Sequence, residues 1–345
     1  MKTNLKDFTI SELGTIVSDM GEQRFRAKQI FKWLYDGAES YENMTNIPKK
    51  LIDKLEKKYS VNNLKIEQKF ISHIDETRRY LLQLDDGNFV ESVLMKYHHG
   101  YTICVSSQVG CAMGCAFCAS TVGGKVRNLT AGEIIGQVMT VQKDLGHRIS
   151  NIVMMGMGEP LDNFDNVLRF LENVNNPLGL NIGYRHITLS TCGLVDRIYE
   201  LADMKLQITL SISLHAPNDE KRSAIMPVNK KYCIDKLLEV CKYYTEQTGR
   251  RISFEYTLIS GINDTETEAK ELLKLIKGML CHVNLIPVNK VKESGFSASN
   301  RRAVEKFQAV LVNGGISATV RREMGADISA ACGQLRANRN AESVK

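Results

Sequence analysis

The chain has 345 residues, 43% of them hydrophobic and 24% charged, with a net charge of +6. This is the composition of an ordinary globular protein with one large or two unequal domains. No apolar run reaches the length of a membrane span and the first residues contain no signal-peptide segment, so we expect a cytoplasmic protein that does not enter a membrane. The nine cysteines are irregularly spaced and odd in number, which argues against a secreted disulfide framework.

Residues 9–59 are predicted to be helical. Apolar residues recur there at helical spacing, at Ala27, Ile30, Phe31, Leu34 and Tyr35. Pro48 near the start of a further apolar run marks another helix start. We therefore expect residues 1–60 to form a helical accessory domain. Its many basic residues fit an RNA-binding side, and a module that serves only for packing fits the sequence equally well.

A β-hairpin extension is predicted over residues 61–100, where the apolar period changes from helical to alternating. Arg79–Leu84 and Phe89–Met95 are the expected strands, and the Asp86-Gly87 pair between them is a strong hairpin signal.

From residue 101 to 335, strands alternate with helices. The expected strands are Tyr101–Ser107, Asn151–Gly156, His186–Cys192, Gln207–Leu214, Ile252–Ile259 and His282–Val288, with a short last strand at Ile316–Arg322. The expected helices are Thr130–Leu145, Phe164–Asn173, Leu194–Ala202, Ile234–Glu246, Thr267–Lys277 and Asn300–Val312. Six β/α units are too few for a closed eight-unit barrel, so the pattern predicts an α/β fold with a partial (β/α)6 barrel. Residues 336–345 are expected to be a tail.

Three cysteines follow the first of these strands within eight residues. Cys111, Cys115 and Cys118 are separated by three residues and then by two. Zinc sites usually need four ligands, and no second cysteine pair or histidine lies nearby. The spacing favours a [4Fe–4S] cluster with three thiolate ligands, which leaves one iron open to bind a small molecule.

The other strand ends are rich in glycine and polar residues. They are Gly156-Met157-Gly158-Glu159-Pro160, Ser190-Thr191-Cys192-Gly193, Ser213-Leu214-His215-Ala216-Pro217-Asn218 and Pro287-Val288-Asn289. Each alone could be a turn or a cap. Because all lie at one face of the predicted barrel, together they predict a site for a polar ligand with hydroxyl and carboxylate groups.

The remaining cysteines and charges leave several interpretations open. Buried structural thiols are expected at Cys233, Cys241 and Cys281, whereas Cys192, at a strand end, is undecided. The region from Ser299 onward holds much of the excess positive charge, and this fits a solvated surface or a phosphate-contacting face about equally.

These motifs resemble the radical S-adenosylmethionine enzymes, and within them the RNA adenine-C2 methyltransferases. The closer resemblance rests on the segments Ser106–Cys111, Met155–Leu161, Ser213–Asp219 and Ala330–Leu335. It implies that Cys111, Cys115 and Cys118 bind the [4Fe–4S] cluster, and that S-adenosylmethionine is bound by Gly158, Glu159, Ser190, Ser213, Leu214, His215 and Asn289. It also implies that Cys332 is itself methylated, that Cys104 resolves the product complex and that Glu91 accepts a proton.

The resemblance further implies a mechanism and partners. Two S-adenosylmethionine molecules serve each turnover: one methylates Cys332, and the other yields a radical that activates the S-methyl group for addition to C2 of adenine. The implied substrates are an adenosine in the peptidyl-transferase region of 23S rRNA and the adenosine beside some tRNA anticodons, the electron donor is of flavodoxin type, and a monomer is expected. Two alternatives stay open, Cfr-like methylation of C8 and a non-catalytic, zinc-stabilised RNA-binding protein.

Overall fold

The computed structural model describes residues 2–289, 291 and 294–335, so the predicted tail at 336–345 lies outside the described residues. Its centre is a ten-stranded sheet in the order β14-β13-β12-β11-β10-β9-β6-β5-β4-β3. The strands are β3 Lys65–Ile71, β4 Arg78–Gln83, β5 Phe89–Tyr97, β6 Gly100–Cys104, β9 Ile149–Met154, β10 Ile187–Thr191, β11 Thr209–Ser213, β12 Ile252–Leu258, β13 Cys281–Pro287 and β14 Ala318–Val320.

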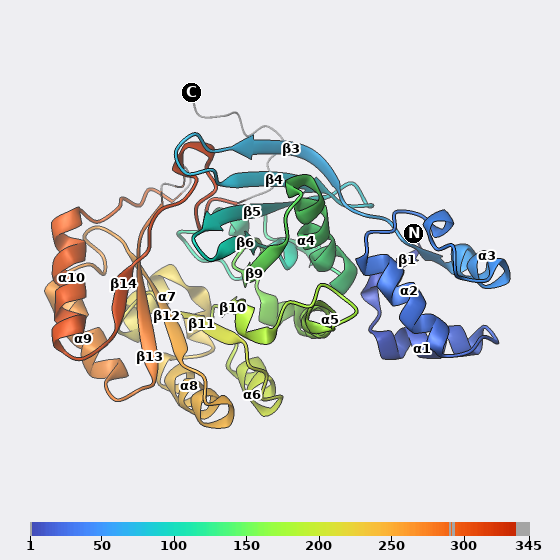
Figure 1. Ribbon diagram of the computed structural model, residues 1–345. Helices are drawn as coiled ribbons and strands as arrows, with labels where there is room; N and C mark the ends of the chain where they lie inside the picture. The colour runs from blue at the N-terminus through green and yellow to red at the C-terminus, as the bar shows by residue number, and fades with distance from the viewer. Residues whose placement is uncertain (1, 290, 292–293, 336–345) are drawn as a thin grey trace.

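The part of the sheet from β6 to β14 is parallel, and each neighbouring pair is joined by a helical crossover. The crossover helices cover one face of the curved sheet (Figure 1). They are α4 Ala131–Leu145, α5 Phe164–Asn175, α6 Val195–Asp203, α7 Asp219–Ile225, α8 Ile234–Thr248, α9 Glu266–Ile276 and α10 Arg301–Asn313. The predicted partial (β/α)6 barrel is confirmed, and β14 adds a further parallel strand beside β13.

The hairpin strands belong to the same sheet as the barrel. β3, β4 and β5 pair antiparallel, and β5 continues antiparallel onto β6 with Val93 opposite Cys104. Gly87 forms the predicted turn with a φ of +84°, a backbone conformation that glycine adopts at little cost. The hairpin extension therefore holds β5 next to Cys104, the last residue of the first barrel strand β6.

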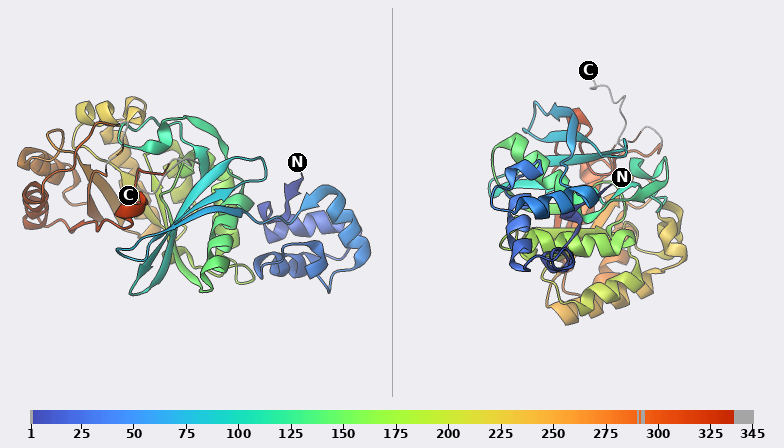
Figure 2. Two further views of the ribbon diagram at one scale, coloured as in Figure 1. Left: turned by 90° about the horizontal axis from the view of Figure 1, so that it is seen from above. Right: turned by 90° about the vertical axis from the view of Figure 1, so that its right-hand side faces the viewer.

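The N-terminal helices form a separate group to one side of the barrel, as Figures 1 and 2 show. They are α1 Ile10–Asp19, α2 Phe25–Tyr35 and α3 Lys49–Lys58, with the short parallel pair β1 Thr3–Asn4 and β2 Tyr59–Ser60 beside them. Thr9 and Glu12 form a capping box at the start of α1. Asp7 holds this group to the barrel, because its carboxylate accepts a 2.8 Å hydrogen bond from the backbone N–H of Gly132 at the start of α4.

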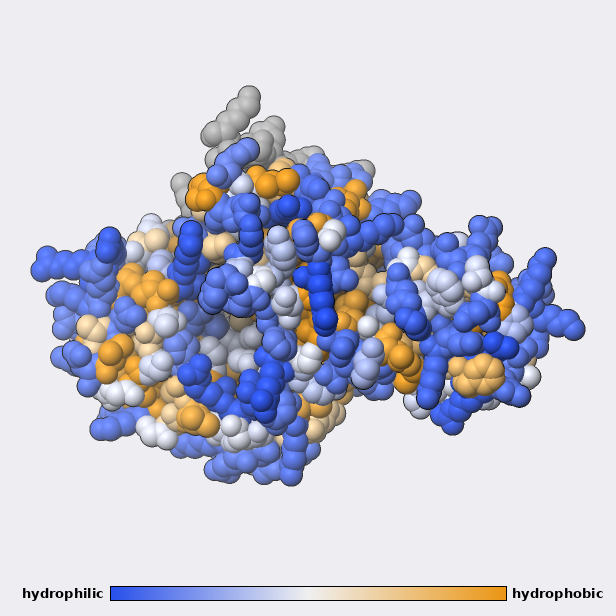
Figure 3. Space-filling view, in the orientation of Figure 1, coloured by the Kyte–Doolittle hydropathy of each residue, from blue (hydrophilic) through white to orange (hydrophobic). Residues whose placement is uncertain are grey.

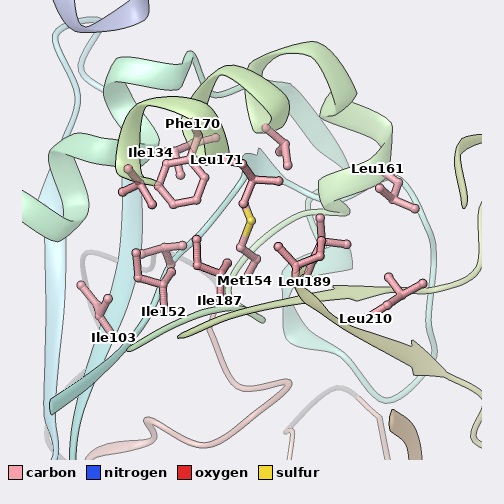
Figure 4. Close-up of a cluster of buried hydrophobic side chains, with 14 of the residues drawn as sticks. Ile103, Ile134, Ile152, Met154, Leu161, Phe170, Leu171, Ile187, Leu189 and Leu210 are labelled. Atoms are coloured by element: carbon pink, nitrogen blue, oxygen red, sulfur yellow. The ribbon is translucent and has the colours of Figure 1, made fainter. Parts of the chain in front are cut away.

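The apolar core lies between the barrel strands and their helices. Figure 4 shows the strand residues Ile103, Ile152, Met154, Ile187, Leu189 and Leu210 with Ile134 of α4 and Phe170 and Leu171 of α5. The outer surface visible in Figure 3 is mostly hydrophilic with scattered apolar residues. Within the described part of the chain, no helix combines the length and apolar character that a membrane crossing requires.

Three features depart from the predicted elements. The first barrel strand ends at Cys104 rather than Ser107, and a second small strand pair follows it, β7 Gln108–Gly110 with β8 Lys125–Asn128. Helix α7 was not predicted, because its seven residues are mostly polar and show no apolar period. Short 3₁₀ helices complete the described chain at Leu5–Asp7, Tyr41–Asn43, Ala119–Thr121, Pro160–Asn163, Tyr184–His186, Pro227–Lys230 and Ala326–Ile328.

Candidate active site

A cavity of about 150 Å³ lies at the carboxyl ends of the parallel strands. The structure brings most of the predicted site residues to its lining, namely Cys111, Cys115, Cys118, Gly158, Glu159, Ser190, Ser213, His215, Asn289 and Cys332. Leu214 differs from them: its side chain is fully buried in the apolar core, and its backbone N–H donates to the carbonyl of Glu255. Parallel strands bring their carboxyl ends to one face of the barrel. Residues from five separate β/α units therefore form one continuous site there.

The three clustered thiols are held by a loop with its own hydrogen bonds. The backbone N–H of Cys118 donates to the carbonyl of Cys115 at 3.1 Å, and the hydroxyl of Thr121 donates to the carbonyl of Cys118 at 2.9 Å. Burial raises the pKa of Cys111 to about 12 and raises the pKa of Cys115 and of Cys118. Bare thiolates are therefore unfavourable here, and a positively charged metal group would stabilise them.

Three thiols of this cavity are the residues that could hold a metal group. Within residues 2–289, 291 and 294–335, no three His, Cys, Asp or Glu side chains converge closely enough to hold one metal ion. Cys111, Cys115 and Cys118 nevertheless line the same cavity. A structural zinc site needs four closed ligands, whereas iron–sulfur clusters are held by cysteine thiolates of this kind.

The GxGEP segment after β9 is shaped by packing against the protein's own chain. A Cβ atom at Gly156 would lie 2.7 Å from the carbonyl oxygen of Val105, and one at Gly158 would lie 2.5 Å from the Cβ of Gln108. Gly158 also has a φ of +97°. These glycines thus approach Val105, directly after β6, and Gln108, the first residue of β7, and this contact holds the segment against the chain that leads into the cysteine loop.

Glu159 is buried and bound by backbone donors. Its carboxylate accepts hydrogen bonds from the N–H of Cys192 at 2.8 Å and of Leu161 at 3.1 Å, and burial raises its pKa. The side chain of Gln108 accepts a 2.9 Å bond from the N–H of Glu159. The carboxylate thus ties the end of β10 to the end of β9 at the edge of the cavity.

His215 lies in an unusual backbone conformation, with a φ of +56°. Asn263 stabilises it by donating to the carbonyl of His215 at 2.7 Å, and the N–H of Thr257 donates to Nδ1 of the imidazole at 2.9 Å. Burial lowers the pKa of His215 to about 3. The ring is therefore neutral with its proton on Nε2, and it presents a fixed hydrogen-bond donor.

A second cavity of about 480 Å³ adjoins the first. Cys332 and Arg321 line both cavities, whereas Cys104 lines only the second, with Val93 and Met95 of β5. Both cysteines are free thiols, and burial raises the pKa of Cys104 to about 12. The amide of Asn289 donates to the carbonyl of Cys332 at 2.9 Å and fixes the backbone of that cysteine between the two cavities.

Glu91 has a different environment. Its side chain is buried and forms a 3.3 Å ion pair with Arg79 on β4, and it is absent from the described linings of both cavities. Side chains alternate along a strand, so Glu91 lies on the same face of β5 as Val93 and Met95, which line the second cavity.

Sequence reasoning missed four residues of this region. Gln108 lies in the segment Ser106–Cys111, but no role was predicted for it there. Asn263 lies outside the quoted motifs and bonds the carbonyl of His215, and buried Arg222 donates to the carbonyl of Cys192. Arg321 could have been found from the sequence. It lies at the end of the predicted strand Ile316–Arg322, and polar residues at strand ends are the ones expected to line the site.

Comparisons with known proteins cover nearly the whole chain. The radical SAM superfamily profile matches residues 105–275, and the profile of the ribosomal RNA large subunit methyltransferase N-terminal domain matches residues 3–61. A probable dual-specificity RNA methyltransferase RlmN from Alkaliphilus oremlandii is 58% identical over 97% of this chain and 98% of its own, and one from Clostridium perfringens is 58% identical over 96% of each. A radical SAM methyltransferase from Sphaerobacter thermophilus superposes with a TM-score of 0.92 at 44% identity, covering 97% of this chain and 100% of its own.

Proposed function

Because the chain belongs to the RlmN family of radical SAM RNA methyltransferases, we propose that it methylates C2 of an adenosine in the peptidyl-transferase region of 23S rRNA and of the adenosine beside tRNA anticodons. The observation that carries this proposal is the position of Cys332, which lines both the cavity of the three clustered cysteines and the adjoining larger one. A group attached to its sulfur can be loaded in one cavity and delivered in the other.

Enzymes of this superfamily use a [4Fe–4S] cluster and S-adenosylmethionine. We assign cluster binding to Cys111, Cys115 and Cys118, and S-adenosylmethionine binding to Gly158, Glu159, Ser190, Ser213, Leu214, His215 and Asn289. When bound, the two cofactors supply the methyl group and the radical chemistry, and the protein supplies positions and shielding. The neutral imidazole of His215 contributes a fixed N–H donor, and the buried carboxylate of Glu159 contributes an acceptor.

The methyl group needs a carrier because C2 of adenine is an electron-poor carbon that cannot attack a sulfonium methyl group. Cys332 is the proposed carrier. Cys104 is the proposed resolving thiol, and its place in the lining of the same larger cavity supports this role. Its attack on the sulfur of Cys332 would form a disulfide as the bond between that sulfur and the transferred carbon breaks. That carbon would keep the electron pair and take up a proton, which completes the methyl group and releases the RNA. Glu91 is the proposed proton acceptor, and its carboxylate forms a 3.3 Å ion pair with Arg79.

The substrate base must leave its stack to reach the larger cavity. The N-terminal helices and the basic region after Ser299 are the proposed RNA contacts, and that region extends beyond the described residues. We propose a flavodoxin-type electron donor, a cytoplasmic location and a monomeric enzyme. Family membership contradicts the non-catalytic zinc alternative. Methylation of C8 instead of C2 remains the competing regiochemistry.

The carrier role is tested by single-cysteine variants under anaerobic conditions. Cys104→Ala should trap RNA covalently on the protein, and Cys332→Ala should give neither adduct nor methylated RNA while keeping its cluster iron. The matched control is Cys233→Ala, because Cys233 is a half-buried free thiol at the start of α8 and is not among the residues lining the two cavities. Turnover by Cys104→Ala without an adduct would contradict the resolving role.

A further inference from the structure

Helix α7 carries an arginine that is fully enclosed by the ends of the barrel strands. The side chain of Arg222 has no exposed surface. Its five hydrogen bonds reach two strand ends and the segment after α7, with acceptors at Leu214 O (3.1 Å), Asn229 Oδ1 (2.9 Å), Tyr232 O (3.4 Å), Cys192 O (2.7 Å) and Ser213 O (3.0 Å). All five acceptors are neutral oxygens: four are backbone carbonyls and one is the side-chain amide of Asn229. The guanidinium therefore links several backbone segments through hydrogen bonds.

Three of these carbonyls belong to the cavity-forming ends of β10 and β11. Cys192 follows β10, and Ser213 ends β11 immediately before Leu214 and His215. Cys192 and Ser213, which bear two of these carbonyls, line the cavity, and so do the nearby residues Ser190 and His215. Because the peptide unit is planar, a hydrogen bond that fixes the direction of its carbonyl also fixes the orientation of the whole plane. The side chains of the two residues joined by that peptide bond are then restricted in direction.

Gly193 lies between this guanidinium and Leu237 of α8. Gly193, with a φ of +102°, has no side chain, and a Cβ there would lie 3.5 Å from Nη2 of Arg222 and 2.8 Å from Leu237. The charge also acts on the cavity, since it adds to burial in lowering the pKa of His215. A buried cation without a carboxylate among its hydrogen-bond partners is costly, which argues that it does more than fill space.

We propose that Arg222 is the positioning residue of the S-adenosylmethionine site, holding the ends of β10 and β11 at the spacing that lets their side chains bind one ligand together. This inference rests on the proposed function, because it presumes that the cavity binds this class of ligand. Arg222 does not line the cavity and takes no part in the reaction itself. Its loss should weaken ligand binding without removing the cysteines that hold the cluster.

Binding of S-adenosylhomocysteine to the anaerobically reconstituted protein tests the proposal by isothermal titration calorimetry, with iron and sulfide content measured on the same samples. Arg222→Lys keeps the charge but cannot bridge the same carbonyls, and its Kd should rise by about tenfold or more at unchanged iron content. The control is Arg250→Lys, since Arg250 donates to the hydroxyl of Thr209 at the opposite end of β11. Its Kd should stay within about twofold of the wild type.

A wild-type Kd for folded Arg222→Lys would overturn the proposal. So would a loss of affinity that follows a matching loss of iron, because that result indicates general structural damage. If Arg222→Lys does not fold, Asn229→Ala replaces it. This change keeps the guanidinium but removes one of its acceptors, together with the bonds that Asn229 donates to Asp219 and Ser223. It should weaken binding several-fold, and an unchanged Kd would reject the positioning role. Absence of binding to the wild type would contradict the proposed function itself, and this inference with it.

Discussion

Replacement of Gly158 by alanine should damage both stability and cofactor binding. Gly158 has a φ of +97°, and a Cβ there would lie 2.5 Å from the Cβ and 2.8 Å from the backbone nitrogen of Gln108. The left-handed conformation alone costs a non-glycine residue about 1–2 kcal/mol. Relief of the clash must move Gln108, whose side chain bonds the N–H of Glu159 and the side chains of Asn128 and Asp162. Loss of such buried partners costs about 1–3 kcal/mol more.

The expected destabilisation of Gly158→Ala is therefore about 2–5 kcal/mol, from the two contributions together. Gly87→Ala is the matched control. Gly87 has a similar φ of +84°, but no other atom lies within 4 Å of a Cβ built there. Its cost should be that of the backbone conformation alone, about 1–2 kcal/mol.

Urea denaturation followed by circular dichroism measures both free energies of unfolding, and titration with S-adenosylhomocysteine measures the effect on the site. Gly158→Ala should lose more stability than Gly87→Ala and should bind the ligand more weakly, whereas Gly87→Ala should bind it normally. Equal losses of stability in the two variants, with equal affinity for the ligand, would refute the close approach between Gly158 and Gln108.

Two further predictions concern buried charged groups. Arg79→Met removes the ion-pair partner of Glu91 and should destabilise the protein by about 3–5 kcal/mol, as judged by urea denaturation; a loss below ~1 kcal/mol would show that the pair is not buried as described. Burial lowers the pKa of His215 in the folded protein from 6.5 to about 3. Between these pH values the unfolded chain binds a proton at His215 and the folded protein does not. The contribution of neutral His215 to stability is therefore fully present above pH 6.5 and declines as the pH falls toward 3. The stability difference between the wild type and His215→Gln should therefore shrink by ~1 kcal/mol between pH 7 and 5.5, and a difference independent of pH would contradict the neutral buried ring.

The fold was predictable because its signals are local and repeated. Buried parallel strands alternate with amphipathic helices, and Asp86-Gly87 sets the hairpin turn. The cavity was predictable for a topological reason, since parallel strands bring their carboxyl ends to one face and so gather residues as distant as Cys111 and Asn289.

The supporting contacts of the site were not predictable in the same way. Arg222 and Asn263 bind backbone carbonyls that are distant from them in the sequence, and a carbonyl carries no sequence signature. The burial of Glu91 against Arg79 depends on strand register, which places Arg79 opposite Val93 and thus diagonal to Glu91. Strands β7 and β8 are too short for an alternating pattern to be recognised.

The central claim, adenosine methylation at C2 through Cys332, is tested most directly by the product. The reconstituted enzyme is incubated anaerobically with S-adenosylmethionine, a reductant and protein-free 23S rRNA, and the digested nucleosides are analysed by mass spectrometry against standards. The wild type should yield 2-methyladenosine and Cys332→Ala should yield none. 8-Methyladenosine as the main product would rule out methylation at C2, and 2-methyladenosine formed at the wild-type rate without Cys332 would rule out the cysteine carrier.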